Sequence, residues 1–354
     1  MPPSISPIIL SSLGRSFRLS CPILHQSNTR MKSTAGYQSC SMDDEKSLSL
    51  YRKVACMRIC LVSGFSTELL EVESEAATLN VLVIPGNPGV VSFYKDFVEA
   101  LYEQLGGCAS ITAIGHVSQS RQDMAYGRLF SFQEQINHKV GFIKELQNKH
   151  LPIILVGHSI GSYICIEILK RFPEQEIFSI LLYPFLTLNT SSLRQRMIGM
   201  LSRSSLLSAT ISHIVALLGS FPTRISRAIV IKLFGPSWST TAVDAACNCL
   251  MKYHTMRNAL FMAKFEFEKL SEEPDWRFLK ENNEQIAFLF GNDDHWGPLS
   301  LFEEISRQVP DALLSIEREG HTHSFSCSEA GSVWVARHVA NFIKNRASNR
   351  QLSQ

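Results

Sequence analysis

One stretch of this 354-residue chain constrains its fold more than any other. In LPIILVGHSIGSY, residues 151–163, a continuous apolar run leads into Gly157-His-Ser159-Ile-Gly161 and then into a helical pattern. A short apolar run without polar alternation is typical of a strand that is buried on both faces of a parallel sheet. The stretch therefore predicts a central parallel strand, a sharp turn at Ser159 and a helix that follows it at once.

The rest of the sequence repeats this change from strand to helix. Two short strands at 55–63 and 67–74 are typical of an opening hairpin. Further strands are predicted at 79–85, 111–115, 151–156, 177–183, 285–290 and 312–316, and helices at 92–105 (behind a Ser92 cap), 132–150, 160–171 and 331–344. Strands that alternate with helices of this length predict an α/β protein with a doubly wound, mostly parallel sheet.

The alternation stops between about residue 185 and residue 283, where helical and apolar signals occur without a convincing strand. We interpret this segment as a helical insertion between two central strands. Its residues 193–218 combine arginines with an apolar stretch at 206–218 that is too short to span a bilayer. Such a segment suits a helix that lies in a lipid interface, and it equally suits a lid whose apolar face packs on the active site.

The first 45 residues differ in composition from the rest. Up to Met42 they contain many serines and several basic residues but no Asp or Glu. That composition is typical of an organellar transit peptide, which would direct the protein to a plastid or mitochondrion. A disordered leader, or a start at Met31 or Met42, also fits. The α/β domain is then expected at 46–354.

The overall composition fits a globular protein with a sizeable core, because 45% of the residues are hydrophobic and 19% are charged. A net charge of +2 does not suggest a nucleic-acid partner. The nine cysteines are scattered and odd in number, which predicts reduced thiols in an intracellular protein. Cys247, Cys249 and His254 fit no common zinc pattern, and no metal or cofactor is predicted.

Ser159 is the candidate nucleophile. In the Gly-x-Ser-x-Gly motif the turn exposes the serine hydroxyl above the sheet, and a side chain at Gly157 or Gly161 would collide with that turn. The helix that follows directs free backbone N–H groups at the same place. A glycine-rich turn with an incidental serine is the alternative. The position between a buried strand and a helix favours a nucleophile, and with it the α/β-hydrolase fold with a helical lid insertion.

A serine nucleophile needs a histidine base and an orienting carboxylate, and in this fold the chain order is serine, acid, histidine. Asp293 and Asp294 both follow the strand at 285–290, and the distance from Gly291 favours Asp294. After the next strand, His321 and His323 compete for the role of base, and the preceding glycine favours His321. His295 is out of order.

Two backbone N–H groups are expected to stabilise the negative oxygen of a tetrahedral intermediate. One belongs to Ile160, the residue after the nucleophile. The other is predicted in the Pro-Gly-Asn-Pro-Gly turn at 85–89, where Asn87 can donate and Pro88 cannot. A plain loop turn is the alternative.

Four motifs together resemble a known family. VLVIPGNPGVVSFY, LVGHSIGSY, the Gly-x-x-Asp-x-Trp-x-Pro of Gly291 to Pro298, and His323-Ser-Phe resemble the lipid droplet-associated hydrolases, from Val81 to the C-terminus. The basic leader departs from the family pattern. In that family the catalytic histidine is followed by one residue and then an aromatic, which implies His323 rather than His321.

The resemblance implies a serine hydrolase of neutral-lipid esters on lipid droplets and the endoplasmic reticulum, with Ser159, Asp294 and His323 as its triad. The expected partners are a lipid ester substrate and a droplet or membrane surface. Two alternatives stay open. The same triad could serve an acyltransferase or a thioesterase, and a droplet-surface protein could bind lipid or recruit partners with little catalysis.

Overall fold

The computed structural model describes residues 53–146 and 151–352, the last four of them by their backbone alone. The predicted leader, the transit peptide proposed within it, Cys21 and Cys40 lie outside these residues. So do the last four residues of the helix predicted at 132–150. The seven described cysteines are free thiols, and Cys247 and Cys249 are buried on a π-helical turn.

The described residues form one eight-stranded sheet with the order β1-β2-β4-β3-β5-β6-β7-β8. β1 and β2 form the predicted hairpin, and β2 is also antiparallel to β4. All other neighbouring strands are parallel. The strands are β1 (Cys56–Val62), β2 (Phe65–Val72), β3 (Leu79–Ile84), β4 (Ala109–Ile114), β5 (Ile153–His158), β6 (Ile177–Leu182), β7 (Ile286–Gly291) and β8 (Leu313–Glu317). The predicted mostly parallel sheet is thus confirmed.

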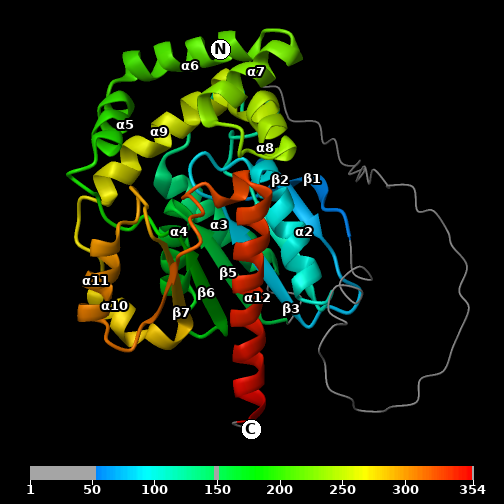
Figure 1. Ribbon diagram of the computed structural model, residues 1–354, viewed down its shortest axis with the longest axis vertical. Coiled ribbons are helices and arrows are strands. Elements are labelled where there is room, and N and C mark those ends of the chain that lie inside the picture. The colour runs from blue at the N-terminus through cyan, green and yellow to red at the C-terminus, as the bar shows by residue number, and fades with distance from the viewer. Residues whose placement is uncertain (1–52, 147–150, 353–354) are drawn as a thin grey trace, which may run out of the picture. The chain divides into compact units, whose positions relative to one another are not determined.

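Helices cover both faces of this sheet because successive side chains of a buried strand point to opposite faces. In β3, Val81 and Val83 belong to the core on one face, and Leu82 and Ile84 belong to the core on the other. Figure 1 shows α12 beside α2 along the first face. The helices of the two layers are α2 (Lys95–Gln104) and α12 (Glu329–Leu352) on the first face, and α3 (Phe132–Leu146), α4 (Ile160–Arg171) and α11 (Leu299–Gln308) on the second.

Two details of the helices differ from the sequence prediction. The helix expected from Ser92 begins as a 3-10 turn, η2 (Val91–Tyr94), and no side chain caps η2 or α2, so the predicted Ser92 cap is wrong. α11 was not predicted. Its buried residues Leu301 and Ile305 are four positions apart, so α11 has a helical periodicity that the prediction overlooked.

Helices fill the chain between β6 and β7, which are neighbours in the sheet. No strand occurs between residues 185 and 283 of the described chain, as the sequence predicts. Figure 1 shows α5 to α9 gathered at one end of the sheet. These elements are α5 (Leu193–Arg203), α6 (Ser205–Gly219), α7 (Thr223–Phe234), α8 (Thr240–Ala245), the π-helical turn η4 (Ala246–Leu250), α9 (Tyr253–Lys269) and α10 (Trp276–Glu281), with the 3-10 turn η5 (Asn283–Gln285) before β7.

A sharp bend separates α5 from α6. The hydroxyl groups of Ser192 and Ser204 cap the two helices by accepting hydrogen bonds from backbone N–H groups of their first turns. The bend is 104°, and this bent pair passes a length and hydropathy test for a membrane span, whereas no single helix of the described chain does.

Candidate active site

The turn after β5 places Ser159 at the carboxyl edge of the parallel strands. Its backbone is left-handed, with φ 55° and ψ −123°, and its N–H donates to the carbonyl oxygen of Leu182 on the neighbouring strand. This strained conformation is typical of a serine held above a strand-to-helix turn. Ser159 is the N-cap residue of α4, and its side chain makes no capping hydrogen bond.

The hydroxyl of Ser159 lies at one end of a hydrogen-bonded chain of three side chains. His323 Nε2 is 2.9 Å from Ser159 Oγ, and His323 Nδ1 is 2.8 Å from Asp294 Oδ2. Because a carboxylate oxygen can only accept, Nδ1 carries the proton and Nε2 is left to accept from the serine hydroxyl. Such a chain can take the proton from a serine as it attacks.

The carboxylate of Asp294 is buried, with only 1% of its side chain exposed. Burial alone would raise its pKa, but the attraction and hydrogen bond of His323 and the backbone N–H groups of Trp296 and Gly297 together lower that pKa. Asp294 is therefore ionised at neutral pH, and its negative charge can stabilise an imidazolium formed when the histidine takes a proton from an attacking serine.

The other candidates of the sequence analysis lie away from this chain. Asp293 and His295 are exposed. His321 is half-buried, with its backbone N–H donated to Glu317 and its ring beside Trp334. The structure therefore brings Ser159, Asp294 and His323 together, and leaves Asp293, His295 and His321 outside their hydrogen bonds.

The loop after β3 lies directly against the serine. A Cβ atom on Gly86 would be 3.0 Å from Ser159 Cβ, so Asn87 follows the point of contact by one residue. Ile160 is the first residue of α4, so its N–H has no acceptor within the helix. Both predicted oxyanion donors thus belong to segments that touch Ser159.

Sequence reasoning missed a buried link between the loops. The phenol of Tyr94 accepts from the N–H of Gly86 at 2.9 Å and lies 2.6 Å from His158 Nδ1. The other ring nitrogen of His158 is 2.8 Å from the carbonyl oxygen of His323. A carbonyl can only accept, so His158 donates from Nε2 and accepts the Tyr94 hydroxyl at Nδ1. Burial lowers the pKa of His158 to about 3, so the ring stays neutral.

A cavity of about 450 Å³ opens over Ser159 and His323. Its wall combines the loop at Asn87 with side chains of α5, α7 and α9, so the helical insertion covers the reaction site. Most of the lining is apolar. It includes Phe93, Phe185, Ile198, Phe234, Trp238, Leu250, Met256, Leu260, Phe267 and Trp296.

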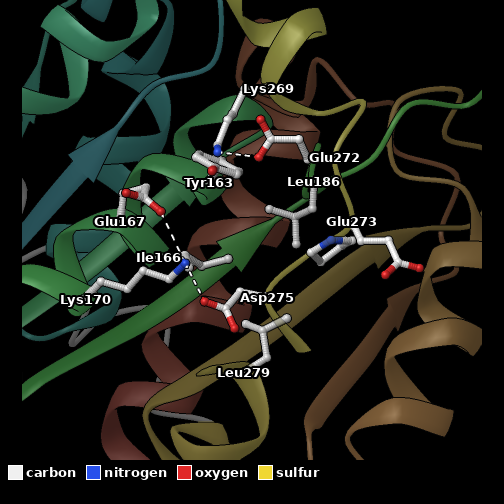
Figure 2. Close-up of a pocket in the computed structure, with 11 residues that line it drawn as sticks. Tyr163, Ile166, Glu167, Lys170, Leu186, Lys269, Glu272, Glu273, Asp275 and Leu279 are labelled. Carbon is white, nitrogen blue, oxygen red and sulfur yellow. Dashed lines mark hydrogen bonds and ion pairs between the residues drawn. The ribbon is translucent and has the colours of Figure 1, made fainter. Parts of the chain in front are cut away.

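A smaller pocket of about 220 Å³ lies between α4, α9 and α10. Its lining includes none of Ser159, Asp294 and His323. Figure 2 shows that most of its charged side chains pair with one another, whereas Glu273 lies apart from these pairs. Lys170 contacts both Glu167 and Asp275, and Lys269 contacts Glu272. These charges stabilise the packing of the helices, and they offer no nucleophile with a base.

Gly161 permits the close approach of α4 to the loop after β3. A Cβ atom there would lie 2.6 Å from the carbonyl oxygen of Pro85 and would also collide with that of Ile84. We therefore expect Gly161→Ala to destabilise the protein by about 3 kcal/mol, the upper end of overpacking costs. Denaturant unfolding measures this change. Gly106→Ala is not a matched control because Gly106 has a positive φ. Ser162→Ala is not one either, because the buried Ser162 hydroxyl donates to the carbonyl oxygen of Gly157.

The model of one protein family matches most of this chain. The lipid-droplet associated hydrolase family matches residues 77–326. The chain belongs to this family. The resemblance seen in the sequence motifs is thus confirmed, and the matched residues include Ser159, Asp294 and His323.

Several lipid droplet-associated hydrolases align with this family member over most of their length. The chain is 28% identical to the one from Gallus gallus, over 69% of this chain and 78% of that protein. It is 26% identical to the one from Dictyostelium discoideum, over 79% of this chain and 94% of that protein. It is 24% identical to the one from Homo sapiens, over 70% of this chain and 79% of that protein. The chain is accordingly a hydrolase by family.

Solved structures confirm the α/β-hydrolase fold of this family member. A haloalkane dehalogenase from Bradyrhizobium elkani superposes with a TM-score of 0.64 at 13% identity, covering 83% of this chain and 99% of that one. A putative lipase from Acinetobacter baumannii superposes with a TM-score of 0.57 at 15% identity, covering 88% of this chain and 100% of that one. At such low identity the likeness concerns the fold alone.

Proposed function

We propose that this family member hydrolyses carboxylic esters of lipids. The observation that carries the proposal is the hydrogen-bonded chain Ser159–His323–Asp294 at the floor of a largely apolar cavity. An apolar cavity favours acyl chains because burying each methylene is worth about 0.8 kcal/mol. Ser159 as the nucleophile also separates the chain from hydrolases of this fold that attack with an aspartate.

The geometry supports a two-step reaction. Ser159 Oγ attacks the ester carbonyl carbon while His323 Nε2 takes its proton, and Asp294 stabilises the charged imidazole. The N–H groups of Ile160 and Asn87 hold the negative oxygen of the tetrahedral intermediate. His323 then gives its proton to the leaving alcohol, and an acyl-enzyme remains. Water then attacks the acyl carbon while His323 takes its proton. His323 returns this proton to Ser159 Oγ as the acyl–oxygen bond breaks, which releases the carboxylic acid and restores the serine.

A fluorophosphonate probe tests this proposal, because it reacts with a serine only when a base activates it. Rapid Ser159-dependent labelling, together with release of fatty acid from a triacylglycerol or cholesteryl ester emulsion, is the expected result. Labelling without release of fatty acid from these oxygen esters would indicate one of the alternatives: an acyltransferase if the acyl group is transferred to an added alcohol, or a thioesterase if a thioester is hydrolysed. A folded protein that does not label would favour a lipid-binding role.

The insertion supports action at a lipid surface. Its helices α5 to α7 leave many large apolar side chains in solvent, including Leu206 at 77% and Leu217 at 63% exposure. Exposed apolar surface on this scale is typical of a binding site. The further members are Leu193, Met197, Met200, Leu207, Ile214, Phe221, Ile225, Ile231, Leu233 and Phe234.

The charge of this surface suits the phosphates of a phospholipid monolayer. Between Glu176 and Asp244 the sequence has six Arg and Lys residues and no Asp or Glu. Among the described residues only one of the six, Arg227, is in an ion pair, with Asp244. Phe234 is both exposed on this surface and part of the cavity wall, so the cavity borders the proposed lipid contact. We propose the monolayer of a lipid droplet as that surface, and residues 185–283 as the lid.

We predict that Leu206→Asp with Leu217→Asp releases the protein from phospholipid-coated triolein droplets. Each side chain contributes about 1.5–3 kcal/mol when fully buried in lipid, so losing the pair should weaken partitioning by roughly 10²- to 10⁴-fold. Droplet flotation measures the effect. Turnover of a short soluble ester should continue because it needs no surface.

A matched control adds the same two charges without removing apolar area. Thr210→Asp with Ser220→Asp changes exposed polar positions on and beside α6. Its flotation should be much closer to that of the unmodified protein. Equal release by both pairs would mean that charge alone acts, and unchanged flotation of the first pair would place the lipid contact elsewhere.

A further inference from the structure

One carboxylic acid in the active-site cavity has no role in the reaction proposed above. Glu266 lies on α9, lines the same cavity as Ser159 and His323, and is only 3% exposed. Its Oε1 accepts a hydrogen bond of 2.8 Å from Asn87 Nδ2. A buried carboxyl group of this kind costs free energy when charged, so its presence requires an explanation.

The contact of Glu266 reaches the proposed oxyanion loop. Asn87 Nδ2 donates to both Glu266 and the carbonyl oxygen of Ala259, each at 2.8 Å, so both side-chain N–H bonds of Asn87 are held by α9. The preceding residue, Gly86, lies against Ser159. Helix α9 therefore fixes the position of Asn87 relative to the nucleophile.

Burial raises the pKa of Glu266 to about 8, and the hydrogen bond from Asn87 only partly opposes that shift. Three other titratable groups line the cavity near it, and burial keeps each of them neutral. Burial raises the pKa of the Tyr94 phenol and raises that of Cys327 to about 12, while it lowers that of His158 to about 3. His323 is the remaining titratable group of the cavity.

The helices packed on α9 bring no charged side chain into this cavity. On α5, Arg194, Arg196 and Arg203 are exposed and line none of it. His213 on α6 is exposed as well. On α3, burial lowers the pKa of both His138 and Lys139, and neither lines the cavity. Apart from the His323 base, Glu266 is therefore the group of the cavity whose charge can change near neutral pH.

We propose that Glu266, through its uncharged carboxyl group, is the positioning residue that holds Asn87 ready to bind the oxyanion. This inference rests on the ester hydrolysis proposed above. The neutral acid accepts from Asn87 without adding charge. An ionised Glu266 would put a negative charge in the same apolar cavity where the negative oxygen develops, and the two charges would repel each other strongly at low dielectric.

The pH profile of kcat/KM tests the inference. For the unmodified protein, kcat/KM on a short ester should fall about 30-fold between pH 7 and 9.5, as an acid of pKa about 8 ionises. Glu266→Gln keeps the hydrogen-bond acceptor and cannot ionise, so its kcat/KM at pH 7 and at pH 9.5 should be nearly equal. The rate measured with Ser159→Ala at each pH gives the background hydrolysis of the ester, and this rate is subtracted. Glu268→Gln, an exposed acid on the same helix, is the matched control and should keep the decline.

A second variant separates positioning from charge. Glu266→Ala removes the acceptor, so kcat at pH 7 should fall about tenfold while KM changes little, because Asn87 contacts the transition state rather than the ester. The same decline above pH 8 in Glu266→Gln as in the unmodified protein would overturn the inference, and so would full kcat in Glu266→Ala. If the unmodified protein neither hydrolyses esters nor labels at Ser159, the proposed function fails and the inference with it.

Thermal unfolding checks the uncharged state independently of activity. Glu266 binds a proton in the folded protein between pH 4.5 and about 8 that it has lost in the unfolded chain, so folding stability falls as pH rises through that window. Glu266→Gln lacks this loss. Its Tm relative to the unmodified protein should therefore rise from pH 5 to pH 8, and a constant difference would contradict a neutral Glu266.

Discussion

Ser159→Ala should lower kcat for ester hydrolysis by roughly 10⁴-fold or more and leave the fold intact. The substitution removes the hydroxyl that lies 2.9 Å from His323 Nε2 and deletes no other described side-chain hydrogen bond of Ser159. Turnover of a short p-nitrophenyl ester and labelling by a fluorophosphonate measure the loss. Tm should change little, because alanine occupies the same backbone position with one atom fewer.

A serine elsewhere on the surface gives the matched control. Ser220→Ala, at an exposed position after α6, should retain turnover and labelling. If Ser159→Ala hydrolysed the ester at the unmodified rate, another residue would be the nucleophile. The lipid-ester proposal and the mechanism would then both be wrong.

His323→Ala should reduce turnover by a similar factor, roughly 10⁴-fold, whereas His321→Ala should stay within about threefold of the unmodified protein. The reason is geometric. His323 bridges Ser159 and Asp294, but His321 points its ring toward Trp334 and donates its backbone N–H to Glu317. Both variants are measured with the same short ester and by thermal unfolding.

Free imidazole sharpens this comparison. Added imidazole should restore part of the turnover of His323→Ala, since the missing group is a base rather than a structural contact. A large loss in His321→Ala with little in His323→Ala would transfer the role of base. It would also contradict the family motif over this loop.

The fold was predictable because its signals are local. The apolar run of β5, the turn and α4 follow one another directly, so the position of Ser159 can be read from consecutive residues. Asp294 is also close to its strand, three residues beyond the end of β7. α11 was missed although Leu301 and Ile305 have helical spacing, so a local signal was present there too.

The choice between His321 and His323 was not local. Both follow β8, and what separates them is how the loop folds back toward Ser159. The residues alone favoured His321 because a glycine precedes it. Only the family motif favoured His323, which the structure places against the serine. Tertiary proximity of this kind leaves no periodic signal in the sequence.

The roles of His158 and Glu266 were missed for related reasons. His158 occupies the variable position before the nucleophile, and only its contacts with Tyr94 and His323 give it meaning. Glu266 follows Ala259, Met262 and Ala263 at helical spacing on the buried face of α9. An acid on such a face was a signal that sequence reasoning could have used, although not its partner, Asn87.

The buried link through Tyr94 and His158 restricts how such a site can evolve. It joins the loop after β3, the turn of the nucleophile and the loop of the base, three segments that are far apart in the sequence. The Tyr94 hydroxyl and the two ring nitrogens of His158 each donate to or accept from one specific neighbour. Replacing either side chain therefore leaves a buried donor or acceptor without a hydrogen bond. Substitutions at Tyr94 and His158 are therefore expected to be accepted in pairs, and lineages should keep or replace the link as a unit.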